Sequence, residues 1–154
     1  MSVKKIIASQ YCEKVNQAAK KFQSLSLPAE GWICTVRNAL NMSAAALARR
    51  LGKTRALVSN TEKAELKGSV TLNTMQSMAE AMSCRFVYAI VPNKRVEDIL
   101  QARAKEKATQ NVRESSQHMA LEQQSLTKQQ IVFEIERLQQ TLLKEMPSDF
   151  WYDE

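Results

Sequence analysis

The side chains with the most specific hydrogen-bonding chemistry lie close together, between residues 54 and 60. Arg55 carries a forked guanidinium that can donate two hydrogen bonds to guanine O6 and N7, and Asn60 carries a carboxamide that can pair with adenine N6 and N7. The Ala56 methyl group can contact the methyl group of thymine, while Thr54 and Ser59 offer hydroxyl groups. We therefore predict that these five residues contact bases of double-stranded DNA.

The sequence offers little for catalysis or metal binding. His118 is the single histidine, and the three cysteines, Cys12, Cys34 and Cys84, form no Cys-x-x-Cys pair. Zinc sites need about four such ligands, and a disulfide framework needs paired cysteines in an oxidising compartment. We expect a protein without catalytic residues, metal or cofactor. We also expect a cytoplasmic location, because no apolar run has the length of a signal peptide or a membrane span.

The base-contacting residues must be positioned by two short helices joined by a tight turn. A helix-turn-helix needs a small residue where its helices cross, and Ala48 supplies one. Four residues later Gly52 allows the positive φ of the turn, and Val58 can bury an aliphatic side chain against the first helix. Thr54 lies where the N-cap of the second helix belongs. Lys53 and Thr61 depart from the pattern, because these sites are usually apolar.

Basic residues surround this motif. Residues 1–94 carry 14 basic and 5 acidic side chains, whereas residues 95–154 carry 8 basic and 11 acidic ones. Phosphate contacts provide affinity and salt dependence but no choice of sequence. The residues predicted to contact phosphates are Arg37, Ser43, Arg49, Arg50, Lys53, Lys63 and Lys67.

The rest of the chain divides at its few prolines and glycines. An amphipathic helix is predicted within residues 1–27, followed by the helix-turn-helix domain at 28–84. Residues 85–92 are β-branched and aromatic and predict one short strand. Because a lone strand needs a partner, we expect it to pair with its copy in a homodimer. The predicted dimerisation residues are Phe86, Val87, Tyr88, Ala89, Ile90 and Val91.

Residues 93–154 predict a helical region for dimerisation or partner binding. Thr127 and Gln130 have the spacing of a capping box, and an apolar stripe from Ile131 to Met146 follows at steps of three and four residues. We interpret this stripe as a surface that seeks a protein partner. The chain ends in an aromatic cluster framed by acidic residues, which we assign to the same role.

Residues 31–83 resemble the Cro/cI-type (XRE) helix-turn-helix family. The resemblance implies an all-α, five-helix lambda-repressor-like DNA-binding domain. Ala44 departs from that family, which often carries a DNA-contacting glutamine there. Direct base contact is therefore expected to depend more heavily on Arg55, Ser59 and Asn60.

A narrower resemblance extends over nearly the whole chain. The segments Gly31–Ile33, Val36–Ser43, Leu47–Gly52, Glu62–Glu65, Val87–Pro92 and His118–Glu122 are similar to the family called mobile mystery protein A. That family is encoded beside a partner with a Fic domain. The resemblance implies an antitoxin of a Fic-type toxin–antitoxin pair, which represses its own operon as a dimer.

One further motif bears on a Fic partner. Ser26, Glu30 and Gly31 fit the Ser/Thr-x-x-x-Glu-Gly/Asn pattern of a Fic-inhibitory helix. Pro28 is tolerated only in the first turn of a helix, so Glu30 is favoured instead as an acidic residue near the start of the Trp32 helix.

The sequence predicts a sequence-specific DNA-binding transcriptional regulator that acts as a homodimer, and the resemblance to mobile mystery protein A implies that it is an antitoxin that represses its own operon. The alternative is a helix-turn-helix interaction module that neutralises a toxin by direct binding without reading DNA. The expected partners are operator DNA, a second copy of the chain and a Fic-domain toxin, with no membrane.

Overall fold

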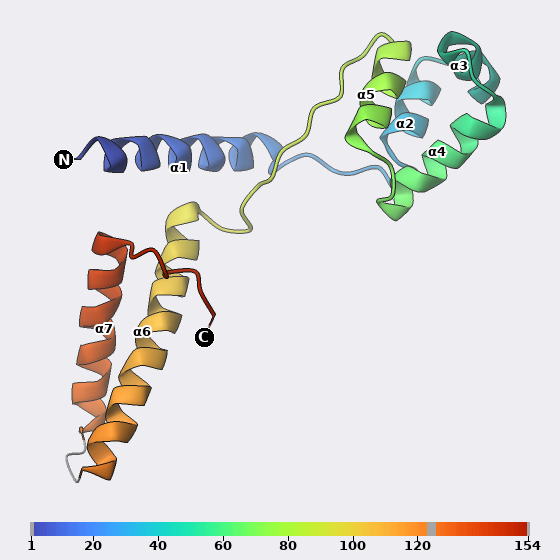
Figure 1. The fold of residues 1–154 in the computed structure, drawn as a ribbon. Coiled ribbons are helices and arrows are strands. Elements are labelled where there is room, and N and C mark those ends of the chain that lie inside the picture. Colours follow the sequence, from blue (N-terminus) through green and yellow to red (C-terminus); the bar gives the residue numbers. More distant parts are fainter. Residues whose placement is uncertain (1, 123–125, 154) are drawn as a thin grey trace. The chain divides into compact units, whose positions relative to one another are not determined.

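The computed structural model describes residues 2–122 and 126–153, which fold as helices joined by loops (Figure 1). The chain divides into two compact units. Residues 21–90 form one unit, and residues 1–20 together with 91–154 form the other. No helix in the described ranges combines the length and apolar character needed to cross a membrane.

Helix α1 (Val3–Phe22) forms within the range in which an amphipathic helix was predicted, but none of its side chains is buried. Its best-defined contact is made by Asn16, whose Oδ1 accepts a hydrogen bond from the backbone N–H of Val96 at 3.0 Å. The Asn16 Nδ2 group donates to Glu97 Oε2 at 3.0 Å. Asn16 thus satisfies an N–H in the first turn of the next long helix, where Arg95 provides no side-chain cap.

Four helices make up the unit at residues 21–90: α2 (Trp32–Ala39), α3 (Ala44–Leu51), α4 (Arg55–Lys67) and α5 (Leu72–Ala81). Ser43, Thr54 and Thr71 cap the N-termini of α3, α4 and α5, each accepting a hydrogen bond from a backbone N–H three residues later. Such caps satisfy N–H groups that have no partner within the helix. The boundaries of these helices are therefore set by local sequence.

The core of this unit lies among the four helices. Side chains from each helix meet there, so α3 and α4 are held in a fixed mutual orientation. The methionines of α5 pack against the helix-turn-helix and act as adaptable fillers. The buried core residues are Ile33, Leu47, Ala48, Val58, Met75, Met78 and Met82.

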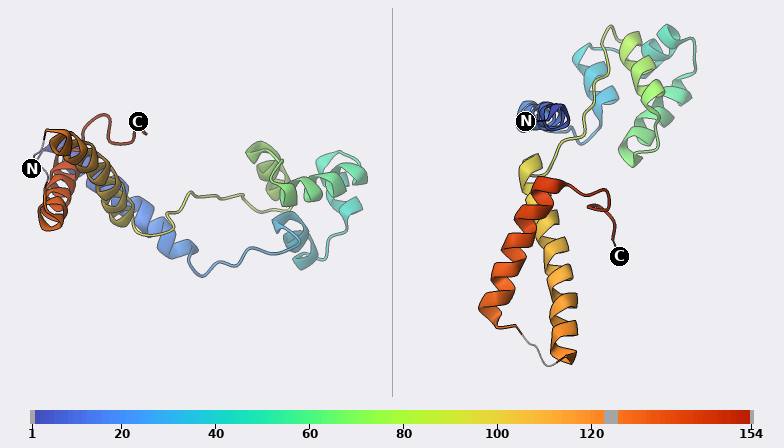
Figure 2. Two further views of the ribbon diagram at one scale, coloured as in Figure 1. Left: turned by 90° about the horizontal axis from the view of Figure 1, so that it is seen from below. Right: turned by 60° about the vertical axis from the view of Figure 1, so that its left-hand side comes forward.

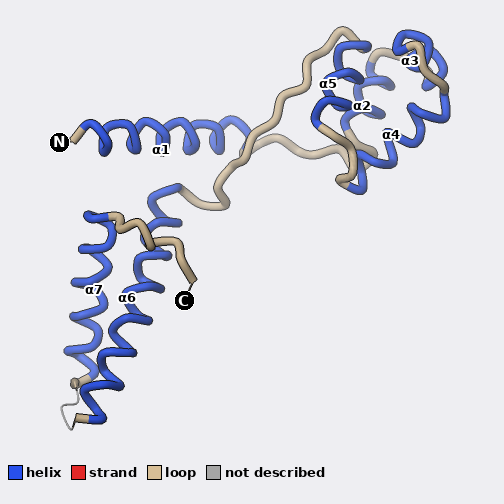
Figure 3. The backbone as a smooth tube through the Cα atoms, in the orientation of Figure 1, coloured by secondary structure: helices blue, strands red, loops and turns tan. Residues whose placement is uncertain are grey.

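Two predictions about this unit are wrong. The five-helix domain expected at 28–84 contains four helices, and the strand expected at 85–92 is an extended segment, since the described residues contain no strand (Figure 3). The sequence from Cys84 to Val91 is β-branched and aromatic, which disfavours a fifth helix. A strand needs a partner for its backbone groups, and the described part of this chain offers none. Phe86 packs against the domain core instead.

The second unit is dominated by a hairpin of α6 (Val96–Leu121) and α7 (Lys128–Glu145), which lie side by side in every view (Figure 2). The capping box predicted for Thr127 and Gln130 is confirmed. Ala104 and Ala108 are fully buried and allow Leu142 to pack closely. The apolar stripe of α7, interpreted as a partner-seeking surface, is therefore largely covered by α6 of the same chain.

The acidic aromatic C-terminus also folds back on its own unit. Phe150 is buried in the hairpin core, and Trp151 packs edge-on against it. Arg103 donates hydrogen bonds to the carbonyl oxygens of Phe150 and Tyr152 at 2.8 and 2.7 Å. It also pairs with Asp153 at 3.0 Å. Much of the C-terminal segment that the sequence analysis interpreted as a protein-binding surface thus packs against the α6–α7 hairpin of its own chain.

Candidate DNA-binding surface

The α3–turn–α4 geometry has the features that the sequence predicts. Ala48 is buried where the helices cross, and Val58 is fully buried against α3. Gly52 ends α3 with φ 65° and ψ 32°, a left-handed conformation in which a Cβ would be strained. The Thr54 hydroxyl accepts a hydrogen bond from the Leu57 N–H at 3.2 Å. Helix α4 therefore begins at Arg55 with its N-terminal turn exposed.

The five predicted base-contacting residues lie together on the N-terminal half of α4. Arg55, Ala56 and Asn60 are exposed, as is Thr54 at the cap, and Ser59 is half-buried. Residues 55 and 59, like 56 and 60, are one helical turn apart and share a face. This face is available to an external partner and offers guanidinium, carboxamide, hydroxyl and methyl groups.

The predicted phosphate contacts separate into two groups. Four remain exposed around the α3–α4 turn and on the C-terminal half of α4, and their side chains form no ion pair among the described residues. Basic side chains at these positions can reach toward the phosphates on either side of a groove occupied by α4. The four residues are Arg49, Lys53, Lys63 and Lys67.

The other three predicted phosphate contacts have structural partners. Ser43 Oγ accepts the N–H of Ala46 at 3.0 Å as the cap of α3. Arg50 Nε donates to the backbone oxygen of Ala81, at the end of α5. Arg37 is held within the domain by an acidic residue of α4. Arg37 is thus engaged inside the domain. The Ser43 hydroxyl can still donate a hydrogen bond, and exposed Arg50 uses only its Nε, so Ser43 and Arg50 remain predicted phosphate contacts.

Two glutamates of α4, which the sequence analysis did not single out, connect it to α2. Glu62 Oε1 accepts a hydrogen bond from Arg37 Nε at 2.8 Å, in a pair whose side chains are only 17% and 14% exposed. This bond raises the pKa of Arg37 above its ordinary value. Glu65 accepts hydrogen bonds from the N–H groups of Trp32 at 2.6 Å and Ile33 at 3.0 Å. The sequence signal that could have indicated these two contacts is the three-residue spacing of Glu62 and Glu65, which places both on one face of a helix.

Glu65 also explains why residue 31 is a glycine. This glycine precedes α2 with φ 86° and ψ 163°, a region that L-residues avoid. A Cβ built at Gly31 would lie 3.0 Å from Cδ and Oε1 of Glu65. Gly31 cannot cap α2 with a side chain, so the carboxylate of Glu65 performs that role from another helix.

Thr61, which departs from the apolar pattern of the motif, is buried beside the core residues. Its hydroxyl donates a hydrogen bond to the carbonyl oxygen of Leu57 at 2.7 Å, one turn earlier in α4. The polar group is therefore satisfied within its own helix.

The candidate Fic-inhibitory motif does not adopt the required helix. Ser26, Glu30 and Gly31 lie in the loop that precedes α2. Glu30 Oε1 accepts a hydrogen bond from the Thr35 hydroxyl at 3.2 Å, which fits its alternative interpretation as an acidic residue near the start of that helix. The described residues also contain no group of three or more His, Cys, Asp or Glu side chains that could hold a metal ion.

The predicted dimerisation segment is mostly accessible. Phe86 is half-buried, and its ring stacks on Tyr88 with centroids 5.8 Å apart. Beyond it, Tyr88 is 68% exposed and Ile90 is 92% exposed, and Val87, Ala89 and Val91 are also exposed. These exposed side chains leave the segment accessible to another chain.

Comparison with known proteins agrees with this geometry over part of the chain. Residues 35–88 match the family model described as helix-turn-helix. No curated protein and no solved structure matches the chain. The match includes both helices of the motif and the exposed face of α4. Residues 35–88 are therefore a helix-turn-helix domain of the Cro/cI (XRE) type.

Proposed function

We propose that this protein is a sequence-specific DNA-binding transcriptional regulator that binds its operator as a homodimer. The observation that carries the proposal is the α4 face of a helix-turn-helix domain, on which the side chains of Arg55 and Asn60 are exposed and make no hydrogen bond to another described residue. In this family of geometries the second helix enters the major groove with its N-terminal residues leading. Direct contact would come from Thr54, Arg55, Ala56, Ser59 and Asn60.

The charges around α4 support nucleic acid as the ligand. Arg49 and Lys53 flank the turn, and Lys63 and Lys67 lie toward the C-terminal end of α4, so cations bracket the base-contacting face. Each phosphate that a cation neutralises releases counterions and contributes to a steep salt dependence.

The dimer is part of the proposal. A second copy could cover the exposed side chains of Val87, Tyr88 and Ile90. Two copies related by a two-fold axis would present two α4 helices to half-sites about 34 Å apart, one turn of duplex. The operator is then expected to be an inverted repeat.

The test is binding to DNA from immediately upstream of the gene, measured by fluorescence anisotropy against a scrambled duplex of equal length. The double variant Arg55→Ala/Asn60→Ala is expected to lose about a hundredfold or more in preference for the operator, since each bidentate contact is worth about 1–3 kcal/mol. Its residual binding to both duplexes is expected to remain, because phosphate contacts carry it. Circular dichroism shows whether the fold is kept.

A matched control separates base reading from general attraction. Lys63→Ala/Lys67→Ala is expected to weaken binding to the operator and the scrambled duplex alike, and so to leave the preference unchanged. If Arg55→Ala/Asn60→Ala retains the full preference, α4 is not the recognition helix. If no duplex binds at low salt, the protein is an interaction module rather than a regulator of transcription.

The antitoxin role is a further part of the proposal. It is supported by the resemblance of the sequence segments given above, and no contact described in the fold adds to that support. If it holds, the neighbouring reading frame encodes a Fic-domain protein whose toxicity is relieved by co-expression of this chain. A neighbouring gene without a Fic domain, or unrelieved toxicity, would contradict it. In either case the DNA-binding test stands by itself.

A further inference from the structure

Helix α1 has the largest net charge among the described helices, because it carries five lysines and a single glutamate. None of its side chains is buried, and its lysines form no ion pair with another described residue. This positive charge is therefore left to attract an anion from outside the chain. The five residues are Lys4, Lys5, Lys14, Lys20 and Lys21.

Four exposed residues align along one side of α1. Gln10, Lys14, Gln17 and Lys21 follow at steps of four, three and four residues, the spacing that brings side chains to one face of a helix. Lysine ammonium groups and glutamine amides donate hydrogen bonds, so this lysine–glutamine face offers donors along its whole length. With a rise of about 1.5 Å per residue, the face extends over about 16 Å.

The lysine–glutamine face is turned away from the contact that α1 makes with α6. That contact is made by Asn16, which bonds to the first turn of α6. Each residue turns a helix by about 100°, so Lys14 and Lys21 lie about 140–160° around α1 from Asn16. Lys5 and Lys20, 11 residues before and four residues after Asn16, share its side instead. The α6 contact therefore leaves the lysine–glutamine face open to another molecule.

We infer that the lysine–glutamine face of α1 binds the phosphate backbone of the same DNA that α4 contacts. Duplex DNA carries one negative charge per about 1.7 Å of its axis, so a face about 16 Å long lies opposite roughly ten charges. Lysine and glutamine side chains are both common donors to phosphate oxygens. These contacts add affinity and salt dependence to those predicted around α4, and they carry no choice of sequence.

The connection between the helices keeps α1 within reach of this DNA. Lys21, at one end of the face, already belongs to the unit at 21–90 that contains the helix-turn-helix. Residues 23–31 join α1 to α2, and the chain from Phe22 to Trp32 spans at most about 35 Å when fully extended. This distance is about one turn of duplex, so DNA held by α4 lies within reach of α1.

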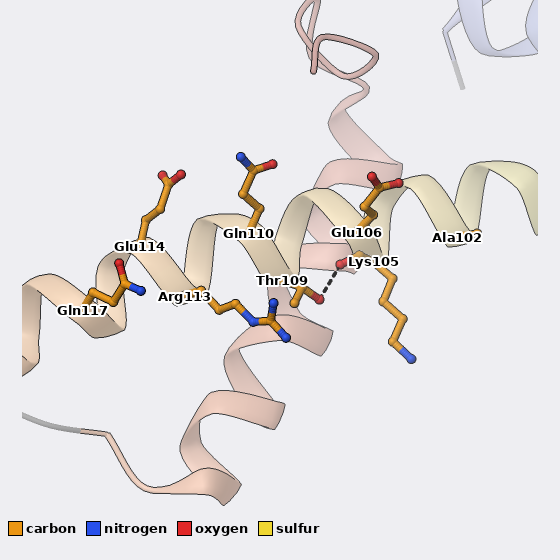
Figure 4. A pocket seen from close by; sticks show the side chains of 8 residues that line it. All are labelled: Ala102, Lys105, Glu106, Thr109, Gln110, Arg113, Glu114 and Gln117. Carbon is orange, nitrogen blue, oxygen red and sulfur yellow. Dashed lines mark hydrogen bonds between the residues drawn. The ribbon is translucent and has the colours of Figure 1, made fainter. Parts of the chain in front are cut away.

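The exposed face of α6 shown in Figure 4 does not have this single sign of charge. Glu106 and Glu114 point to one side of it, and Lys105 and Arg113 point to the other. Equal numbers of opposite charges largely cancel in their effect on a polyanion. The lysine–glutamine face of α1, which contains no acidic residue, is therefore the better match for DNA.

The inference rests on the DNA binding proposed above and adds a second contact to it. It is tested in the full-length chain with Lys14→Gln/Lys21→Gln, which removes two charges and keeps both side chains polar. The matched control, Lys5→Gln/Lys20→Gln, removes the same charge from the side of α1 that carries Asn16. Affinity for the operator duplex and the scrambled duplex is measured by fluorescence anisotropy over a range of salt concentrations.

We expect Lys14→Gln/Lys21→Gln to reduce the slope of log K against log salt by about 1.8 per bound chain on both duplexes, since each neutralised phosphate contributes about 0.9. The slope of the control is expected to stay near its wild-type value. Lys14→Arg/Lys21→Arg retains both charges and is expected to keep the wild-type slope. The preference for the operator over the scrambled duplex should be the same in all three variants. Circular dichroism checks that each variant is folded.

An unchanged slope in Lys14→Gln/Lys21→Gln overturns the inference and leaves the face for an acidic protein partner. An equal loss of slope in the control also overturns it, because that result shows only general attraction by net charge. If the operator preference is intact while the slope is unchanged, only the α1 contact is refuted. If the slope falls as expected on the scrambled duplex but no operator preference exists, only the sequence-specific regulator is refuted.

Discussion

The carboxylate of Glu65, near the end of α4, binds the first turn of α2 through the backbone N–H of Trp32 at 2.6 Å. This contact joins α4 to a residue 33 positions earlier in the chain. It performs from a distance the role that a Ser or Asp would perform locally, because Gly31 has no side chain with which to cap α2. The orientation of α4 is thus secured from its C-terminal half, away from the residues proposed to contact DNA.

Replacing Glu65 by Ala is expected to lower the free energy of unfolding by about 1–2 kcal/mol, because two N–H groups lose their acceptor. Glu65→Gln keeps one amide oxygen as an acceptor and is expected to lose less. Urea denaturation followed by circular dichroism measures both. Equal stability of Glu65→Ala and the wild type would contradict the assigned role.

Arg37 and Lys63 are expected to separate stability from DNA binding. Arg37→Met leaves Glu62 partly buried without its partner and should lower the free energy of unfolding by about 1–3 kcal/mol. The salt dependence of DNA binding should not change. Lys63→Met should reduce the slope of log K against log salt by about 0.9 with little effect on stability. A reduced slope in Arg37→Met would restore Arg37 as a phosphate contact.

Thr61→Val tests the polar residue in the motif's apolar site. Its hydroxyl is bonded only within α4, to Leu57, so a methyl group of similar size can replace it without leaving a buried donor. The free energy of unfolding is expected to stay constant or rise by about 0.5–1 kcal/mol. Thermal denaturation measures this, with Thr61→Ser, which keeps the hydroxyl and loses the methyl, as the destabilised control. A loss above about 1 kcal/mol in Thr61→Val would show that the hydroxyl is required.

Arg103→Met should release the C-terminal segment from the hairpin. The variant keeps the aliphatic stem but loses the hydrogen bonds to the carbonyl oxygens of Phe150 and Tyr152. We expect a loss of about 1–3 kcal/mol in the α6–α7 unit and faster amide exchange at residues 149–153, with the unit at 21–90 unaffected. Arg113→Met, on the same helix without a contact to this segment, is the matched control. Unchanged exchange would contradict the clamp.

Glu97 gives a pH-dependent contact between α1 and α6. Hydrogen bonds from its own backbone N–H and then from Asn16 lower the pKa of Glu97 below its ordinary value of 4.5. A lowered folded-state pKa means that the stabilisation is complete above pH 4.5 and is lost as the pH falls through the folded value. Asn16→Leu should raise the Glu97 pKa part of the way back, as followed by NMR titration of its carboxyl carbon. An unchanged pKa would exclude the Asn16 contact in solution.

The parts of the fold that follow from neighbouring residues could be predicted. The caps at Thr54, Thr71 and Thr127 depend on a side chain and an N–H three residues later, and the turn at Gly52 depends on one residue's freedom of φ. The exposed face of α4 follows from helical periodicity once its start is known. For these reasons the sequence alone located the motif and the residues proposed to contact bases.

Contacts between distant segments were decided only by the tertiary structure. The sequence could not tell that Arg37, predicted to contact a phosphate, would form an ion pair with Glu62 inside the domain. It could not tell that the α7 stripe and Phe150 would be covered by α6 rather than by a partner. It predicted a strand at 85–92 from β-propensity, although a strand also needs a neighbour that the described chain does not supply. Amphipathicity and charge indicate that a face of a helix needs a partner, but only the packing of the folded chain decides which segment covers it.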